Sequence, residues 1–219
     1  MDKLPPWSAS SIDSFVSCPK KYYHLRVAKD VKDFPPSDAV LLGRKLHKAF
    51  EDAVNLGTKL PPEYSQYSYL VDKIRALPGD KNAEIKLAVD ENFNAVEYFS
   101  KQAWSRGAAD LVVLKGDKCL IIDYKTGKRK DSNQLALYAA YAFAKWPEIK
   151  RVITMYVWLK TKQIDQHVYD VSEKETLWQM WLPATRRLKI AYDTGKWEAK
   201  PSGLCRGWCP CKDCEYCEL

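Results

Sequence analysis

The sequence predicts an α/β fold in which a central mixed sheet is flanked by helices. Residues 38–56 carry apolar side chains at helical spacing, which predicts a long amphipathic helix. From residue 84 onward the apolar residues alternate or run together as they do in strands, with helical patterns returning at 131–145 and 173–193. This order is not a regular β-α-β repeat, so we expect a mixed rather than an all-parallel sheet.

The composition favours one packed domain spanning residues 1–219. Hydrophobic residues make up 46% of the chain, and 8 Trp and 13 Tyr supply large side chains for a core. The net charge of +7 is compatible with a polyanionic partner but does not require one. No apolar run approaches the roughly 18 residues of a membrane span, and the N-terminus lacks a signal-peptide core. We therefore expect a cytoplasmic protein without a membrane partner.

Helices account for the first part of the chain. Ser8 or Ser10 can cap a helix that ends at Cys18, because the residue before a proline is disfavoured in helical geometry. The remaining predicted elements of this part are a short helix at 20–26, a loop at 29–37, the helix at 38–56, a helix at 67–77 and a turn at 78–80.

Strands dominate the second part. The sequence predicts strands at 84–89, 103–106, 109–114 and 118–125, a helix at 131–145, strands at 152–159 and 163–169, and a long helix at 173–193 capped by Ser172. A cysteine-rich tail follows from residue 195.

The strand at 118–125 ends in residues that could take part in a reaction, Asp123-Tyr124-Lys125. Residues two apart on a strand project from the same face, so Asp123 and Lys125 should point together. A carboxylate suits a divalent cation, and a lysine ammonium can orient a water or stabilise a phosphate oxyanion. An isolated pair of this kind is more often an exposed surface pair, so the interpretation depends on the rest of the chain.

Asp110 and His47 supply that support. If Asp110 starts one strand and Asp123 ends its antiparallel neighbour, the two acids lie at the same end of the sheet. Neighbouring carboxylates repel each other and are usually tolerated because a cation lies between them. An imidazole from His47 would favour Mn2+ as well as Mg2+. We therefore predict a metal site formed by His47, Asp110 and Asp123, which leaves Lys125 for the substrate.

Four motifs occur in order along the chain: Gly43-x3-His47-x3-Glu51, Gly107-x2-Asp110, Asp123-x-Lys125-x-Gly127 and Gln134-x3-Tyr138. Together they resemble the PD-(D/E)XK nuclease superfamily and, within it, the RecB-like exonuclease group, which includes a RecB-like CRISPR-associated nuclease and related phage exonucleases. A serine-rich helix ending in Cys-Pro and the terminal cysteines extend the resemblance over most of the chain. It implies a restriction-endonuclease-like core.

The resemblance also implies a role for each matching residue. His47, Asp110 and Asp123 would bind Mg2+ or Mn2+, with the backbone carbonyl of Tyr124 as a further ligand. Lys125 would position the attacking water.

Residues outside the metal site receive weaker assignments. Gln134 and Tyr138 would face the same site and contact DNA or the lysine, although a core aromatic is an equally good interpretation of Tyr138. Glu51 could support His47, and Glu84 stands where some relatives carry another acid, but a solvated acid is the simpler interpretation of Glu51.

Seven cysteines are spread unevenly, with Cys18 near the start, Cys119 in a strand and five between residues 205 and 217. In a reducing compartment such a group fits a metal or iron–sulfur site better than disulfides. The resemblance implies a 4Fe-4S cluster held by one N-terminal and three tail cysteines, here Cys18, Cys205, Cys209 and Cys214. Such a site would join the terminal segments 1–36 and 195–219. The additional C-x2-C pairs suit Zn2+ equally well, so both groups stay open.

The activity that the resemblance implies is that of a divalent-metal-dependent DNA exonuclease acting on single-stranded DNA or DNA ends. Phage or host recombination, repair and CRISPR adaptation are the implied settings. The implied protein partner is a second copy of the chain or a protein of those pathways. If the protein is phage-encoded, its location would be the host cytoplasm. The basic segments 128–130 and 20–23 could contact DNA. A structure-specific DNA endonuclease and a non-catalytic, cluster-bearing DNA-binding subunit stay open as alternatives.

Overall fold

The computed structural model describes residues 4–129 and 133–217. The chain divides into two compact units, the first formed by Met1–Pro35 and Gln179–Leu219 and the second by Pro36–Trp178. Both terminal segments singled out by the sequence therefore belong to the first unit. The expectation of a single domain over the whole chain stays a prediction.

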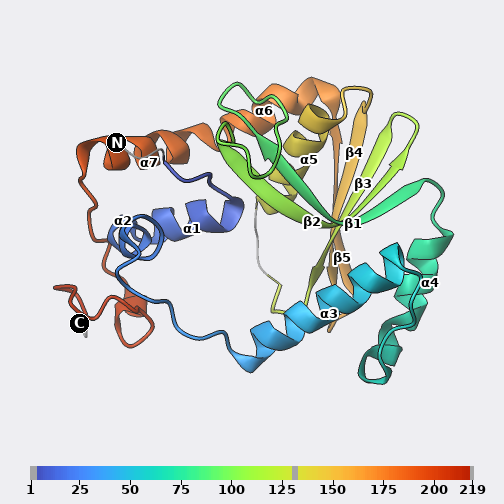
Figure 1. Ribbon diagram of the computed structural model, residues 1–219, viewed down its shortest axis with the longest axis horizontal. Helices are drawn as coiled ribbons and strands as arrows, with labels where there is room; N and C mark the ends of the chain where they lie inside the picture. The colour runs from blue at the N-terminus through green and yellow to red at the C-terminus, as the bar shows by residue number, and fades with distance from the viewer. Residues whose placement is uncertain (1–3, 130–132, 218–219) are drawn as a thin grey trace. The chain divides into compact units, whose positions relative to one another are not determined.

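The second unit is built on a five-stranded sheet with the order β1-β2-β3-β4-β5 (Figure 1). The strands are β1 (Asp80–Val89), β2 (Ser105–Lys115), β3 (Lys118–Lys125), β4 (Arg151–Trp158) and β5 (Gln163–Asp170). β3 and β4 are parallel, and the other neighbouring pairs are antiparallel. Parallel neighbours need a crossover connection, which α5 (Gln134–Lys145) provides. The predicted α/β fold with a mixed central sheet flanked by helices is confirmed.

The main core of this unit lies between the sheet and the helices that precede it. α3 (Asp38–Asn55) contacts β1 and β2, and it is followed by η2 (Pro62–Tyr67) and α4 (Ser68–Ala76). The buried residues of this core are Leu46, Phe50, Ala53, Tyr64, Val71, Ile74, Leu111, Val113, Ile122, Tyr124, Val157 and Leu159. Burial of this apolar face fixes the helix that carries His47 against the sheet.

α5 is buried along its whole length from Leu135 to Phe143, which explains its unusually apolar sequence. On this helix the Tyr141 hydroxyl lies 2.5 Å from the Ser105 hydroxyl of β2. Gly107 allows this close approach, because a Cβ atom there would lie 3.2 Å from the Tyr141 ring and 3.4 Å from the Tyr138 ring.

Several element bounds differ from those predicted. The strands expected at 103–106 and 109–114 are one strand, β2, and β1 begins at Asp80 rather than at residue 84. The start expected at 131 for the following helix lies outside the described residues. The helix expected at 173–193 is divided into α6 (Lys174–Gln179) and α7 (Leu182–Thr194), since Pro183 occupies the first turn of a new helix. Asp170, rather than Ser172, caps the short η3 (Val171–Glu173) before α6.

The first unit contains α1 (Ala9–Ser17), α2 (Pro19–Tyr22), the π-helical η1 (Tyr23–Ala28), α7 and η4 (Gly203–Cys205). The predicted cap is present, because Ser8 and Ser11 form a reciprocal capping box at the start of α1. Trp197 packs against Phe15, Tyr22 and Tyr23, with ring centroids 5.3–6.4 Å apart. Across the part of the chain that the structure describes, no helix combines the length and apolarity that crossing a membrane requires.

Candidate functional site

Three neighbouring strands place an acid in the same row of the sheet. Leu111 of β2 pairs with Ile122 of β3, so the next positions along these antiparallel strands are Asp110 and Asp123. On the other side of β2, the register places Glu84 of β1 opposite Asp110. Asp110 lies inside β2 rather than at its start, because the segment at 103–106 belongs to the same strand.

The regular pairing is interrupted at this row. Glu84 has a φ of 53°, a left-handed conformation that is uncommon for a residue other than glycine. The β1–β2 ladder skips Glu84 and Asp110. Asp110 instead uses its side chain, which accepts a hydrogen bond of 2.7 Å from the Tyr124 amide. Glu84 and Asp110 thus depart from regular sheet geometry, as residues at functional sites often do.

His47 joins two of these acids. One ligand atom from each of His47, Glu84 and Asp110 lies within 4.8 Å of the others, and His47 Nδ1 is 3.2 Å from Asp110 Oδ1. Metal–oxygen distances of about 2.0–2.6 Å place two ligands of one ion at most about 5 Å apart, so the group fits a divalent cation. Two carboxylates and an imidazole also suit Mg2+ and Mn2+ chemically.

A glycine allows α3 to approach this site. Gly43 lies one turn before His47, and a Cβ atom at Gly43 would be 3.0 Å from the Thr126 hydroxyl oxygen. The glycine of the His47 motif therefore permits a close contact between α3 and the turn after β3.

The electrostatics of the group favour a bound cation. Burial raises the pKa of Glu84, and the negative charge of Asp110 raises it further. Burial by itself lowers the pKa of His47, but its hydrogen bond with Asp110 and the charges of Asp110, Asp123 and Glu84 outweigh this effect, so the pKa is raised overall. The negative charge of Asp110 contributes to both shifts, and a bound cation would neutralise this charge.

Asp123 lies outside this three-residue group. Its side chain is almost fully buried, and its Oδ2 atom is 2.6 Å from the Lys125 ammonium. Burial and the charge of Asp110 raise the pKa of Asp123 to about 6, although the ion pair with Lys125 opposes the shift. The structure therefore brings Asp123 and Lys125 together as predicted, whereas ligation of a metal by Asp123 stays a prediction.

Lys125 is held by a chain of hydrogen bonds from α5. Its ammonium donates to Gln134 Oε1 at 3.0 Å, and Gln134 Nε2 donates to the Tyr138 hydroxyl at 2.7 Å. The Tyr138 hydroxyl donates in turn to the Ala108 carbonyl at 2.6 Å. Of the two residues that the sequence placed near the lysine, Gln134 contacts it directly, whereas Tyr138 is linked to it only through Gln134 and is also a buried core aromatic.

Tyr156 is a neighbour of Lys125 that the sequence interpretation missed. The Lys125 ammonium lies 5.0 Å from the centre of the Tyr156 ring, and the Tyr156 hydroxyl is 3.4 Å from Gln134 Oε1. Its position follows from the parallel pairing of Asp123 with Tyr156, a tertiary relation without a local sequence signal.

The Tyr124 side chain belongs to the core rather than to the lysine side of the strand. Its ring packs 4.6 Å from Phe50 and 6.0 Å from His47. Metal binding by the Tyr124 carbonyl is a separate matter and stays a prediction.

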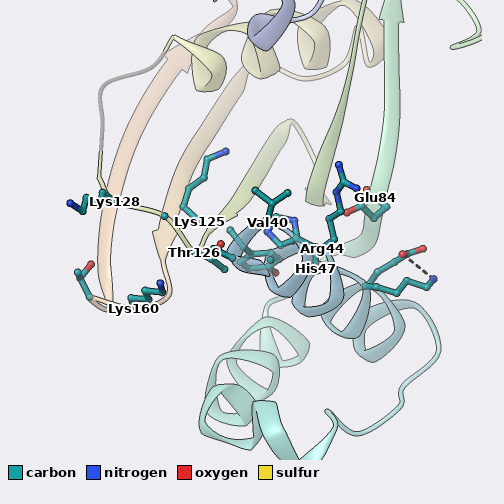
Figure 2. Close-up of a pocket in the computed structure, with 15 residues that line it drawn as sticks. Val40, Arg44, His47, Glu84, Lys125, Thr126, Lys128 and Lys160 are labelled. Carbon is teal, nitrogen blue, oxygen red and sulfur yellow. Dashed lines mark hydrogen bonds and ion pairs between the residues drawn. The ribbon is translucent and has the colours of Figure 1, made fainter. Parts of the chain in front are cut away.

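A cavity of about 930 Å³ opens beside these residues. Figure 2 shows Lys128 and Lys160 on one side of it and His47 and Glu84 on the other. Its charged lining residues are Arg44, His47, Lys48, Glu51, Glu84, Lys125, Lys128 and Lys160. The excess of cations is typical of a site for a polyanion. Glu51 forms an ion pair with Lys48, and this pair explains its position without a supporting contact to His47.

The two predicted basic segments have different surroundings. Of the segment at 128–130, Lys128 lines the cavity, Arg129 pairs with Asp165, and residue 130 lies outside the described residues. In the segment at 20–23, Tyr22 is buried, and the half-buried Tyr23 packs against Trp197.

The first unit gathers most of the cysteines. Cys18, Cys205, Cys209, Cys211 and Cys214 line one small cavity, and the described cysteines are all free thiols without a disulfide. The Lys200 amide donates to Cys18 Sγ at 3.4 Å, and Lys20 forms an ion pair with Glu215. The tail and the N-terminal helices are therefore in contact through protein groups, and a cluster between them stays a prediction.

Comparisons with known proteins provide independent information. A model of the PD-(D/E)XK nuclease superfamily matches residues 6–104 and 87–218. The solved structure of SSO0001 is similar at 14% identity, covering 100% of this chain and 90% of that one with a TM-score of 0.45. A "Putative exonuclease" from Eubacterium rectale is 13% identical, with 97% and 86% covered and a TM-score of 0.48. Similarity at this level does not assign an activity. A search of curated proteins found no match.

Proposed function

The chain belongs to the PD-(D/E)XK nuclease superfamily, and on this basis we propose that it is a divalent-metal-dependent DNA exonuclease acting on single-stranded DNA or DNA ends. The observation that carries the proposal is the group of His47, Glu84 and Asp110, of which His47 and Glu84 line the same cation-rich cavity as Lys125. An acid–imidazole metal site next to a positively charged cavity suits hydrolysis of a phosphodiester.

The metal would be Mg2+ or Mn2+, held by His47, Glu84 and Asp110, with Asp123 and the Tyr124 carbonyl as further ligands that the family resemblance implies. The ion, when bound, lowers the pKa of a water and neutralises charge on the scissile phosphate. The protein positions these ligands through the interrupted sheet row and the buried face of α3.

Lys125 would orient the attacking water and stabilise the phosphate oxyanion. The ion pair with Asp123 and the hydrogen bond to Gln134 hold the amine in place and restrict its direction. Tyr138 anchors Gln134 to the Ala108 carbonyl, so the two α5 residues act as positioning residues for the amine. Arg44, Lys128 and Lys160 line the same cavity and would hold neighbouring phosphates.

We further propose that the cysteine cavity of the first unit holds a 4Fe-4S cluster, with zinc as the alternative. Cys18, Cys205, Cys209 and Cys214 are the ligands implied by the family, and buried Cys211 lines the same cavity. Protein purified without oxygen should absorb near 400 nm if the cluster is present. Colourless protein that contains stoichiometric zinc would instead establish the alternative.

The central test is degradation of end-labelled single- and double-stranded DNA with Mg2+ or Mn2+. Wild type should shorten labelled strands, whereas Glu84→Gln and Lys125→Ala should lose most of the rate. Asp72→Asn, which changes an exposed acid on α4, is the matched control and should behave as wild type. Equal degradation by all variants, or degradation by none with either metal, would refute the assigned site.

Circular single-stranded DNA separates the proposed exonuclease from a structure-specific endonuclease, because only the endonuclease can cut a substrate without ends. Binding of DNA without any cleavage would identify a non-catalytic DNA-binding subunit. Recombination, repair and CRISPR adaptation are proposed settings on the family resemblance alone.

A further inference from the structure

A second cluster of cations and aromatic rings lies on the β1–β2 pair, outside the residues assigned above. Lys86 of β1 and Arg106 of β2 surround two consecutive aromatic residues, Tyr98 and Phe99, in the connection between these strands. Phe99 is 77% exposed, the highest exposed fraction among the large apolar side chains that the structure describes. With Tyr98 and the two cations beside it, Phe99 forms an exposed group rather than an isolated apolar side chain.

The four side chains form one connected surface. The Lys86 ammonium lies 5.1 Å from the centre of the Phe99 ring and 5.7 Å from that of Tyr98. The Arg106 guanidinium lies 5.1 Å from the Tyr98 ring, and the two rings meet edge to face at 5.0 Å. These contacts fix the cations next to the rings while most of the Phe99 surface stays open to solvent.

The strand register relates this surface to the metal group. Ala88 pairs with Arg106 and Lys86 pairs with Ala108, so Lys86 and Arg106 project from the same face of the strand pair. Lys86 is two residues from Glu84 in β1. The surface therefore begins next to the residues that would hold the ion.

The charge of the surface determines what can cover it. Among the residues that the structure describes, neither Lys86 nor Arg106 forms an ion pair with a carboxylate. Covering these cations with an apolar protein surface would remove them from water without compensation. A polyanion that carries flat rings satisfies both features, because phosphates neutralise the cations and bases stack on the aromatic ring.

We propose that Lys86, Tyr98, Phe99 and Arg106 form a stacking platform for an unpaired base of a single-stranded nucleic acid. The platform rests on the proposed nuclease function and adds a substrate preference to it. Bases inside a duplex are already stacked on their neighbours, so only a single strand or a frayed end can place a base on Phe99. The strand would continue from the platform along β1 to the metal group.

The test measures binding separately from cleavage. A fluorescein-labelled twelve-nucleotide thymidine strand is titrated with the full chain in EDTA, and binding is followed by anisotropy. Phe99→Ala should weaken binding roughly 5- to 150-fold, the range for the loss of one base–aromatic stack. Tyr69→Ala is the matched control, because Tyr69 is an exposed aromatic with a lysine, Lys73, over its ring on α4. It should bind as wild type does.

Two further measurements identify the groups that are recognised. A strand of abasic residues should bind Phe99→Ala and wild type equally, since no base is available to stack. Lys86→Ala should reduce the slope of log affinity against log salt by about 0.7, the value for one phosphate on a single strand.

The platform is refuted if Phe99→Ala and Tyr69→Ala bind the thymidine strand equally, or if Phe99→Ala weakens binding of the abasic strand as much as that of the thymidine strand. Either result would leave Phe99 as a surface for another partner, such as a protein. If this chain binds the thymidine strand through Phe99 but cleaves no DNA, the platform stands and the proposed nuclease function is refuted. Cleavage that is unaffected by Phe99→Ala, with unchanged binding, would do the reverse.

Discussion

Replacement of Tyr138 by phenylalanine tests whether α5 positions Lys125 for the proposed reaction. The change removes one hydroxyl that donates to the Ala108 carbonyl at 2.6 Å and accepts from Gln134 Nε2 at 2.7 Å. Gln134 then loses its anchor and can turn away from Lys125. We therefore expect both a loss of stability and a loss of nuclease rate.

The magnitude follows from the burial of the site. Tyr138 is almost fully buried, so water does not readily replace its hydroxyl next to the Ala108 carbonyl. A buried polar group left without a partner costs about 1–3 kcal/mol of unfolding free energy. In a protein of this size that loss corresponds to a decrease in Tm of about 2–12 °C.

A matched variant separates stability from catalysis. Tyr141→Phe removes another buried hydroxyl from the same helix, one that contacts Ser105 and has no link to Lys125. Both variants should lose similar stability in urea unfolding. When DNA degradation is measured at a temperature below 37 °C, only Tyr138→Phe should have a lower initial rate. Equal rates for the two variants would refute the positioning role and leave Tyr138 as a core residue.

Three further predictions concern the metal group. Acidification from pH 7 to 5 should weaken Mn2+ binding measured by calorimetry, because the ligand His47, whose pKa is raised, and Asp123, with a pKa of about 6, both take up protons in this range; Asp123→Asn should reduce this dependence and leave the part due to His47. The stability of the metal-free protein should change in the opposite direction and increase on acidification. The pKa of Asp123 is raised in the folded state, so its protonation stabilises the folded protein as the pH falls from about 6 towards the pKa of the unfolded chain, and the urea midpoint should increase. Glu84→Gln should weaken Mn2+ binding about 10-fold or more, and unchanged affinity would exclude Glu84 as a ligand.

The sequence predicted β3 with the bounds that the structure has, because a continuous apolar segment ends there in clear turn residues. It divided β2 into two strands, because the small residues around Gly107, which admit α5, conceal the alternation. It extended one helix through residue 181, although Pro183 starts a new helix. Each of these differences arises where packing or a single residue overrides a local pattern.

The candidate site shows the same limit. His47, Asp110 and Lys125 stand out because their motifs are local and spaced in order. Glu84 was only a weak candidate, since its place beside Asp110 depends on the β1–β2 register and on a left-handed backbone conformation. Tyr156 has no local signal, because parallel pairing across a crossover brings it to the lysine.

The way in which this site is assembled also makes it a reporter of complete folding. Its acids require three paired strands, its imidazole comes from a helix that precedes them, and its lysine is fixed by a helix that follows. All these groups lie in the second unit, and a state in which any one of its strands or either of these helices has not yet packed cannot hold them in register. In a refolding experiment, DNA hydrolysis should therefore return only when the folding of this unit is complete, after the signal of helix formation has recovered.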